Sequence, residues 1–257
     1  MNTQQPKQFK ILLIGDDCVD VYQFGTVDRI SPEAPVPVFE CTHEERKPGM
    51  AGNVLKNLQM LGCEVLYLHS EKSTKTRLID SRSKQQIVRI DSDSKCTPLE
   101  DTLAFNLTFL HAMPEKFDAI VISDYNKGTV TYELIAELQQ RFAGPIFVDT
   151  KKTDLARLEG CIVKINQLEL SRITSRCTDL IVTQGDKGAV WNDIHFTTRR
   201  VEVADVCGAG DTFLAALTYK YLLEGTNMAP AINFAIRASA VTVQHIGNYA
   251  PSVDEVV

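Results

Sequence analysis

The stretch Asp205–Phe213, with the sequence DVCGAGDTF, places two glycines and an acidic residue before an apolar pattern of helical period. Glycines before a helix let the backbone turn sharply, and the first N–H groups of the helix can then hold an anion. A carboxylate beside a permanent anion would repel it, whereas a general base there takes a proton while negative charge develops. The pattern therefore indicates phosphoryl transfer from a nucleotide to a hydroxyl, with Asp211 as base and backbone N–H groups of this turn as donors. An ordinary helix start, with Asp211 as a cap, is the alternative.

The helix after this turn is predicted to be amphipathic, because Phe213, Leu214, Leu217, Tyr221 and Leu222 fall on one face. Upstream, short apolar runs alternate with helical patterns, and each run ends in a polar or charged residue. That alternation predicts a parallel, helix-covered sheet whose carboxyl ends meet at one edge. We expect this edge to gather Asp124, Asp149, Lys151, Asn166, Glu169 and Thr183.

Composition limits the class of protein. The chain has 257 residues, 44% of them hydrophobic, and a net charge of −6. This length and composition predict one globular domain over residues 1–257. The mild acidity argues against a nucleic-acid partner, and the lack of a long apolar run argues against a membrane span or signal peptide. The seven cysteines stand singly, which favours reduced thiols, no structural zinc and a cytoplasmic protein.

Two segments near the N-terminal half are predicted to form a small β lid, at approximately residues 24–41 and 74–91. The first contains two Val- and Pro-rich runs, and the second contains two alternating runs around a polar tip. A purely structural hairpin is the alternative to a lid. The second segment carries four basic residues that could bind an anionic substrate or simply form a solvated strand face: Lys75, Arg77, Arg82 and Arg89.

Other elements position the rest of the candidate site. The apolar run 9–14 predicts a buried strand that ends at Gly15-Asp16. The glycine-rich turn 47–53 leads into a predicted helix over 54–61, and Asn53 could bind a ligand hydroxyl or cap that helix. A separate strand is predicted over 64–68, a helix over 99–113, a hairpin over 187–198 and a final helix over 228–245.

These motifs resemble the ribokinase-like (PfkB-type) carbohydrate kinases. The shared features are GAGDTF, the NxxE motif at Asn166–Glu169, the Gly15-Asp16 strand end and the PGxAxN turn. The string RISPEAPVPV at 29–38 resembles the lid of the D-glycero-β-D-manno-heptose-7-phosphate kinase branch, as do SKQQIVRID at 83–91, SDYNKGT at 123–129 and DTKKTD at 149–154. The resemblance covers nearly the whole chain in order.

The resemblance implies a three-layer α/β/α fold with a mostly parallel sheet and a small β lid, which often pairs two subunits. It implies ATP-dependent phosphorylation of the anomeric hydroxyl of a heptose 7-phosphate or a related sugar phosphate. By the same resemblance, Asp211 is the base, and backbone N–H groups of Gly208, Ala209 and Gly210 hold the transferring phosphoryl group. The sugar phosphate is bound by Asp16, Gly49, Asn53 and Lys151, with Arg89 as a further candidate. The nucleotide is bound by Asn166, Glu169, Thr183, Gly185 and Gly188, and Asn166 and Glu169 organise Mg²⁺ through water. Use of a monovalent cation near Asp205 stays open.

Several residues depart from the family pattern. Met50 interrupts the usual glycine pair of the sugar-binding turn, Ile236 replaces an Asn near the nucleotide, and Cys207 replaces a Thr. Residues are missing relative to the family between His69 and Thr74 and again after Ser171, and Thr150-Lys151-Lys152 replaces Pro-Lys-Gly. These changes support a second hypothesis, a non-catalytic sugar- or nucleotide-binding relative. The complete GAGD and NxxE motifs favour the kinase, because a binding protein needs no base beside an anion site.

Overall fold

The computed structural model describes residues 8–92, 95–102 and 116–256. A single sheet runs through the described chain, in the strand order β10-β9-β8-β7-β6-β5-β1-β3-β4, with β2 paired to β1. Its strands are β1 (Lys10–Ile30), β2 (Pro37–Met50), β3 (Glu64–Asp80), β4 (Gln86–Ser92), β5 (Ala119–Asp124), β6 (Ile146–Thr150), β7 (Ile162–Asn166), β8 (Leu180–Thr183), β9 (Ala189–Trp191) and β10 (Ile194–Phe196). The strands from β3 through β1 and β5 to β8 are mutually parallel, as predicted.

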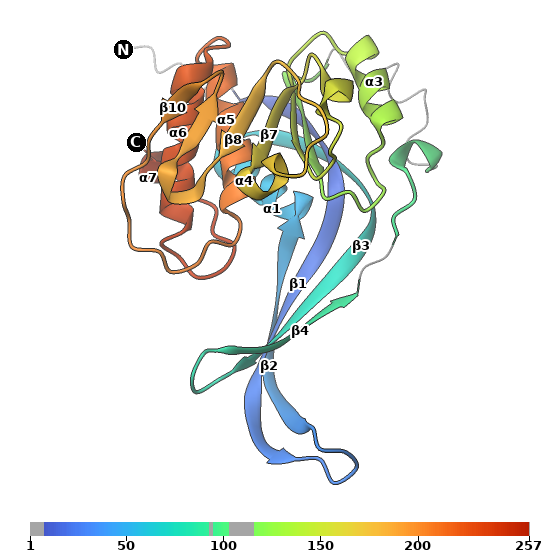
Figure 1. Cartoon of the computed structure of the whole chain (residues 1–257), viewed down its shortest axis with the longest axis vertical. Helices are drawn as coiled ribbons and strands as arrows, with labels where there is room; N and C mark the ends of the chain where they lie inside the picture. The colour runs from blue at the N-terminus through green and yellow to red at the C-terminus, as the bar shows by residue number, and fades with distance from the viewer. Residues whose placement is uncertain (1–7, 93–94, 103–115, 257) are drawn as a thin grey trace.

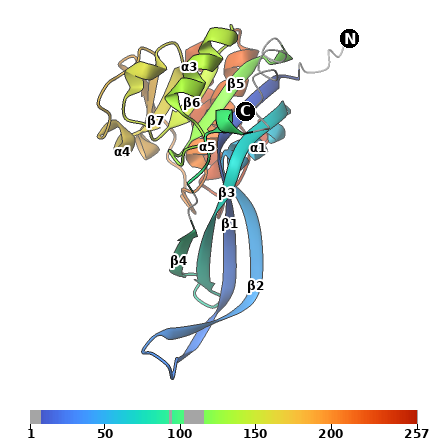
Figure 2. The same cartoon turned by 90° about the vertical axis from the view of Figure 1, so that its right-hand side faces the viewer.

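Helices cover both faces of this sheet (Figures 1 and 2). They are α1 (Ala51–Met60), α3 (Tyr132–Arg141), α4 (Gln167–Leu170), α5 (Ala209–Leu223), α6 (Met228–Thr242) and α7 (Val253–Val256), with short 3₁₀ turns at Leu99–Asp101, Leu155–Leu158 and Gly185–Lys187. Strand alternation explains the layers, because successive side chains point to opposite faces. Ile11 and Leu13 of β1 pack in a core with α1, α5 and α6, while Leu12 and Ile14 pack in a second core with α3. The predicted three-layer arrangement is therefore confirmed.

The lid extends from one end of the body as a separate four-stranded piece of the same sheet (Figure 1). It consists of the second halves of β1 and β3 together with β2 and β4. Beyond Asp17, β1 pairs with β2 on one side and β3 on the other. The lid therefore includes the predicted segments 24–41 and 74–91 and also residues 17–23 and 42–50.

The strand predicted at 64–68 is confirmed but is longer than predicted, because β3 runs without interruption from the body into the lid. The body pairs Lys10↔Glu64 to Gly15↔His69 continue as Asp17↔Lys72 to Gly25↔Asp80 after one register shift. This junction coincides with the residues missing relative to the family between His69 and Thr74. The shortened connection joins a body strand directly to a lid strand.

Two other predicted elements differ from the structure. Helix α5 is buried on every side from Asp211 to Thr218, instead of along one apolar face, because it packs between α1, α6 and the sheet. The predicted helix 99–113 begins as the 3₁₀ turn Leu99–Asp101, and its residues 103–115 lie outside the described part of the chain. No described helix combines the length and the apolar character that a membrane span requires.

Candidate active site

The parallel strands bring the predicted polar residues to one edge of the sheet. The last register pairs of adjacent strands are Gly15↔Ser123, Asp124↔Thr150 and Asn166↔Thr183. Asp149, Lys151 and Glu169 belong to the same strand ends or follow them directly. Helix α5 begins over this edge, since a side chain on Gly210 would meet Lys164 and Asp149 within about 4 Å.

Asp211 lies in the first turn of α5 and is almost completely buried. Gly208 precedes this turn in the left-handed conformation, with φ of 77°, and a Cβ there would lie 2.7 Å from Nδ2 of Asn53. Only glycine therefore fits the position. Asn53 Nδ2 donates to Asp211 Oδ2 at 2.8 Å, and the Tyr125 hydroxyl donates to Asp211 Oδ1 at 3.0 Å. The helix cap of α5 is Gly208, so Asp211 is not the cap.

Burial raises the pKa of the Asp211 carboxyl from 3.8 to about 6. The hydrogen bond from Asn53 lowers this pKa, the neighbouring Asp149 carboxylate raises it, and Lys164 and the Tyr125 hydrogen bond lower it. A carboxylate with a pKa near 6 is ionised at neutral pH and still accepts a proton readily. The environment of Asp211 therefore suits a general base.

Asn53 takes part in this site and does not cap its own helix. The N-cap of α1 is Met50, and no side chain caps that helix. Asn53 is fully buried, and Asn57 Nδ2 donates to its backbone carbonyl at 2.8 Å while Thr212 Oγ1 donates to Asn57 Oδ1 at 2.9 Å. This chain of hydrogen bonds fixes α1 against α5 and aims Asn53 at Asp211.

Lys164 and Asp149 form a buried ion pair beside the start of α5, which the sequence analysis did not identify as a pair. Lys164 Nζ lies 2.6 Å from Asp149 Oδ2, and both side chains are more than nine-tenths buried. A lysine inside the apolar run 162–165 was the signal that could have revealed it, since a buried lysine requires a partner. The pair places one positive charge close to the backbone of Gly210.

Asn166 and Glu169 form a capping box at the start of α4. Asn166 Oδ1 accepts from Glu169 N at 2.9 Å, and Glu169 Oε2 accepts from Asn166 N at 2.7 Å. Lys151 Nζ contacts the other oxygen, Glu169 Oε1. In the described residues, no group of three or more His, Cys, Asp or Glu side chains could hold a metal ion. Asn166 Oδ1 and both Glu169 oxygens already have partners within the chain, so contact with Mg²⁺ through water stays a prediction.

Asp16 and Arg89, two predicted substrate-binding residues, both have hydrogen-bond partners within the chain. Asp16 is fully buried, and its carboxylate accepts from the backbone N–H groups of Tyr125, Lys127 and Thr129. It holds the loop after β5 in place. Arg89 lies on the exposed strand β4 and donates two hydrogen bonds of 2.7 Å to Asp91.

The lid face toward the body carries charged residues near the site, among them the predicted candidates Lys75 and Arg77. Asp20 and Arg77 form a short pair, with Arg77 Nη1 2.6 Å from Asp20 Oδ1. Gly49 packs against this pair, because a Cβ there would lie 2.3 Å from Asp20 Oδ2. Lys75 is adjacent to Asp20 in the β1–β3 register, and its ammonium group lies 5.7 Å from the centre of the Tyr125 ring.

Met50 lies in the turn that is predicted to bind sugar, and its backbone conformation is unusual. It is 4% exposed and has φ of 49° and ψ of −131°, a combination that favours glycine. The departure noted in the sequence is therefore also a strained backbone position.

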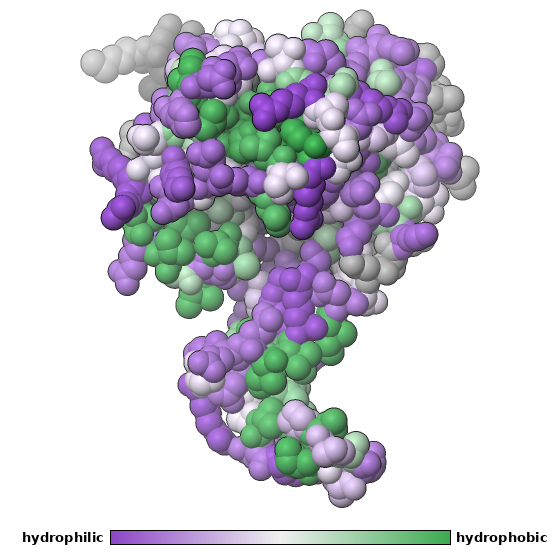
Figure 3. All heavy atoms as spheres, in the orientation of Figure 1, coloured by the Kyte–Doolittle hydropathy of each residue, from purple (hydrophilic) through white to green (hydrophobic). Residues whose placement is uncertain are grey.

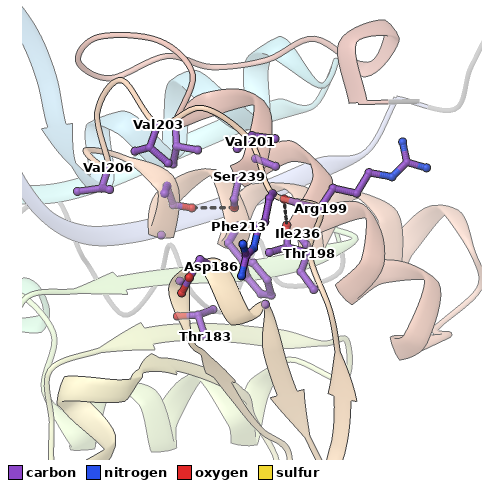
Figure 4. A pocket seen from close by; sticks show the side chains of 17 residues that line it. Thr183, Asp186, Thr198, Arg199, Val201, Val203, Val206, Phe213, Ile236 and Ser239 are labelled. Atoms are coloured by element: carbon purple, nitrogen blue, oxygen red, sulfur yellow. Dashed lines mark hydrogen bonds between the residues drawn. The ribbon is translucent and has the colours of Figure 1, made fainter.

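A pocket of about 630 Å³ lies on the other side of the α5 start (Figure 4). The predicted nucleotide residues Thr183, Gly185 and Gly188 line it together with Ala209 and Gly210, and Ile236 and Val206 contribute apolar surface. Ser239 Oγ donates to the carbonyl of Ala209 at 3.0 Å and joins α6 to this turn. Arg199 and Arg200, which the sequence analysis did not consider, also line the pocket.

The region around Asp205 is closed by backbone hydrogen bonds. Asp205 Oδ1 accepts from Cys207 N and Oδ2 accepts from Gly247 N, each at 2.9 Å. These bonds connect the loop before α5 with the loop after α6. A monovalent cation at this place stays a prediction.

Comparison with known proteins agrees with this architecture. Residues 161–255 match the sequence model of the pfkB family carbohydrate kinases. The chain is 33% identical over 297 positions to the bifunctional protein HldE of a Nitratiruptor species and 31% identical over 304 positions to that of Helicobacter pylori. Both alignments cover 96% of this chain. The chain spans 64% and 65% of the length of these two curated relatives.

Solved structures with the same fold include phosphofructokinase-2 from Escherichia coli in complex with potassium, with a TM-score of 0.72 and 18% identity. Arabidopsis thaliana ribokinase complexed with ribose and ATP superposes with a TM-score of 0.70 and 14% identity. The first comparison covers 97% of both chains, and the second covers 97% of this chain and 98% of the other. The ribokinase-like PfkB resemblance is confirmed. Since the Nitratiruptor alignment spans 297 positions and this chain has 257 residues, the relative contains segments that this chain lacks.

Proposed function

We propose that this chain is an ATP-dependent carbohydrate kinase that transfers the γ-phosphoryl group to a hydroxyl of a sugar phosphate, with Asp211 as general base. The observation that carries the proposal is the position of Asp211 at the start of α5. Ala209 and Gly210 of the same turn line a pocket large enough for a nucleotide, while the Asp211 side chain is directed toward Asn53 and Tyr125. A phosphoryl donor and an acceptor hydroxyl would thus meet across one helix terminus.

In the proposed reaction, the acceptor oxygen attacks the γ-phosphorus while its proton passes to Asp211. The bond between the γ-phosphorus and the β–γ bridging oxygen breaks, and ADP leaves. Backbone N–H groups at Gly208, Ala209 and Gly210 would hold the transferred group, since charge on its oxygens is stabilised by donors at a helix N-terminus. Asn166 and Glu169 would orient Mg²⁺ through water. When bound, Mg²⁺ would neutralise charge on the nucleotide phosphates.

The acceptor is proposed to be anionic because the lid presents cations to the site. Lys47, Lys75 and Arg77 lie next to one another in the β2–β1–β3 register, on the side where Asn248 of the body reaches Asp20. Lys151 lies near the same Tyr125 ring, 5.3 Å from its centre. A heptose 7-phosphate, acting through its anomeric hydroxyl, is the substrate that the sequence resemblance favours. Because ATP is the proposed donor, a cytoplasmic location is part of this proposal.

The lid is also the proposed contact between two copies of the chain. Its surface carries exposed apolar side chains at Ile30, Val36, Val88 and Ile90, with Ile30 62% exposed (Figure 3). Exposed apolar side chains grouped on one extension are typical of protein–protein contacts. Sedimentation measurements on the intact chain and on Ile90→Lys test this part of the proposal.

Binding of ATP–Mg²⁺ tests the nucleotide half of the proposal. A ligand present at 100 times its Kd stabilises the folded protein by about 2.7 kcal/mol, which thermal denaturation detects. We expect this stabilisation with millimolar ATP and Mg²⁺. Absence of any shift would contradict the kinase. A shift without turnover on any sugar phosphate would support the non-catalytic relative, which the strained Met50 in the sugar-binding turn favours.

A further inference from the structure

Both carboxylate oxygens of Asp211 already accept a hydrogen bond in the structure. Asn53 Nδ2 donates to Oδ2, and the Tyr125 hydroxyl donates to Oδ1 at 3.0 Å. A general base must direct a lone pair at the proton that it abstracts, within hydrogen-bond distance. The Tyr125 hydroxyl therefore occupies Asp211 Oδ1, one of the two oxygens to which an acceptor hydroxyl could donate.

The backbone of Tyr125 is fixed, whereas its ring is held by groups that an anionic ligand would attract. Tyr125 N donates to Asp16 Oδ2 at 2.7 Å, directly after β5. The ring has the ammonium groups of Lys75 and Lys151 at 5.7 and 5.3 Å from its centre. A phosphate-bearing sugar would compete for both ammonium groups and so weaken their hold on the ring. Rotation of the side chain would then release Asp211 without moving the backbone.

We propose that Tyr125 is a gate over the base: without sugar its hydroxyl occupies Asp211 Oδ1, and the arriving sugar phosphate replaces it there. This inference rests on the proposed kinase function and adds a device that suppresses transfer to water. In wasteful hydrolysis a water oxygen attacks the γ-phosphorus, its proton passes to Asp211, the bond to the β–γ bridging oxygen breaks, and ADP and inorganic phosphate form. The Tyr125 hydroxyl denies water the proton acceptor that this step needs.

The decisive experiment compares Tyr125→Phe with Tyr132→Phe. Phenylalanine at 125 keeps the ring beside the two lysines and removes only the hydroxyl. Tyr132 also has its ring beside cations, Lys152 and Arg157, but its hydroxyl accepts from the backbone N–H of Asp154 and does not contact Asp211. Phosphate release from ATP–Mg²⁺ without sugar and ADP release with a sugar phosphate are measured for both variants and the unmodified protein.

We expect Tyr125→Phe to raise sugar-independent hydrolysis by about tenfold or more relative to transfer, since a positioned base contributes factors of about 10² to 10⁴. The acid limb of the pH–rate profile should also move to higher pH, because the Tyr125 hydrogen bond lowers the Asp211 pKa. Tyr132→Phe should leave both rates within about twofold, as for a substitution outside the reacting groups. Unchanged hydrolysis in Tyr125→Phe, or equal loss of hydrolysis and transfer with an unmoved pH profile, overturns the gate.

A second measurement tests the same contact without catalysis and without replacing Tyr125. Near-ultraviolet tyrosine absorbance is followed from about pH 5 to 8 in the unmodified protein and in Asp211→Asn. A tyrosine difference band that titrates near pH 6, and is missing in Asp211→Asn, supports the contact. No band in the unmodified protein overturns the gate. If the unmodified protein transfers phosphate to no sugar while the band is present, the proposed function has failed and the tyrosine contact has not.

Discussion

Replacement of Asp211 by Asn should change how the stability of the protein depends on pH. Burial raises the pKa of this carboxyl from 3.8 to about 6 in the folded state. Between these two values the folded protein holds a proton that the unfolded chain has released. The contribution of Asp211 to the free energy of unfolding is therefore greatest below about pH 4, and this contribution is lost as the pH rises through about 6. Asn at the same position carries no titrating proton and removes this dependence.

The size of the effect follows from the shift. Each pKa unit corresponds to about 1.4 kcal/mol, so a rise from 3.8 to about 6 amounts to roughly 3 kcal/mol in total. Close to half of this, about 1 kcal/mol, falls between about pH 5 and 7, and almost none falls above that range. Asn offers one acceptor oxygen in place of two, so Asn53 or Tyr125 loses a partner at a cost of about 1–3 kcal/mol. That cost does not vary with pH and cancels when the pH dependence of the two proteins is compared.

Urea denaturation at a series of pH values measures this difference. The free energy of unfolding of Asp211→Asn minus that of the unmodified protein should increase from pH 5 to 7 by about 1 kcal/mol and then stay level. Asp186→Asn, an acidic residue of the nearby turn Gly185–Lys187 that is not buried, provides the matched control and should show no such trend. A flat difference over this range would refute a raised Asp211 pKa. A difference that instead decreases with pH below about pH 4 would mean that the carboxyl is stabilised in its charged form.

Three further predictions test particular contacts. Met50→Gly should be more stable than Met50→Ala by about 1 kcal/mol in denaturation, which reverses the usual order, because Met50 has φ of 49°; the usual order would argue against strain. Gly188→Ala should unfold more easily and bind ATP more weakly in calorimetry, since its Cβ would lie 1.9 Å from the Phe196 carbonyl oxygen. An unchanged affinity for ATP would mean that this turn does not contact the nucleotide. Asp149→Asn should move the acid limb of the pH–rate profile to lower pH, because Asp149 raises the Asp211 pKa, and Lys164→Met should move it to higher pH, because Lys164 lowers that pKa. Shifts of both variants in the same direction would contradict these opposite effects on the Asp211 pKa.

The strand ends could be predicted because the apolar runs are short and each ends in a polar residue. Asp124, Asn166 and Thr183 lie where that pattern put them, since register in a buried parallel sheet is strongly constrained. The continuation of β3 into the lid could not be predicted in this way. Residues 70–75, with the sequence SEKSTK, have no apolar alternation, and their strand pairing depends on β1 beside them.

Side-chain partners were harder to predict than positions. The sequence did not reveal that three backbone N–H groups from the loop after β5 donate to the Asp16 carboxylate. Binding of substrate by Asp16 stays a prediction. Tyr125 was recognised only as part of a motif, and its contact with Asp211 joins residues 86 positions apart. Lys164 and Asp149 belong to adjacent strands, so their pairing follows from register and not from spacing along the chain. Such contacts depend on tertiary packing, which sequence periodicity does not encode.

The most direct test of the proposed function is ADP release from ATP–Mg²⁺ with D-glycero-D-manno-heptose 7-phosphate and a small panel of other sugar phosphates. Asp211→Asn is the control. The proposal predicts turnover with an anionic sugar in the unmodified protein and its loss in Asp211→Asn, with ATP binding retained in both. Turnover with another sugar phosphate alone would keep the base and change the substrate. No turnover across the panel with folded, ATP-binding protein would contradict the kinase and leave the non-catalytic binding protein as the explanation.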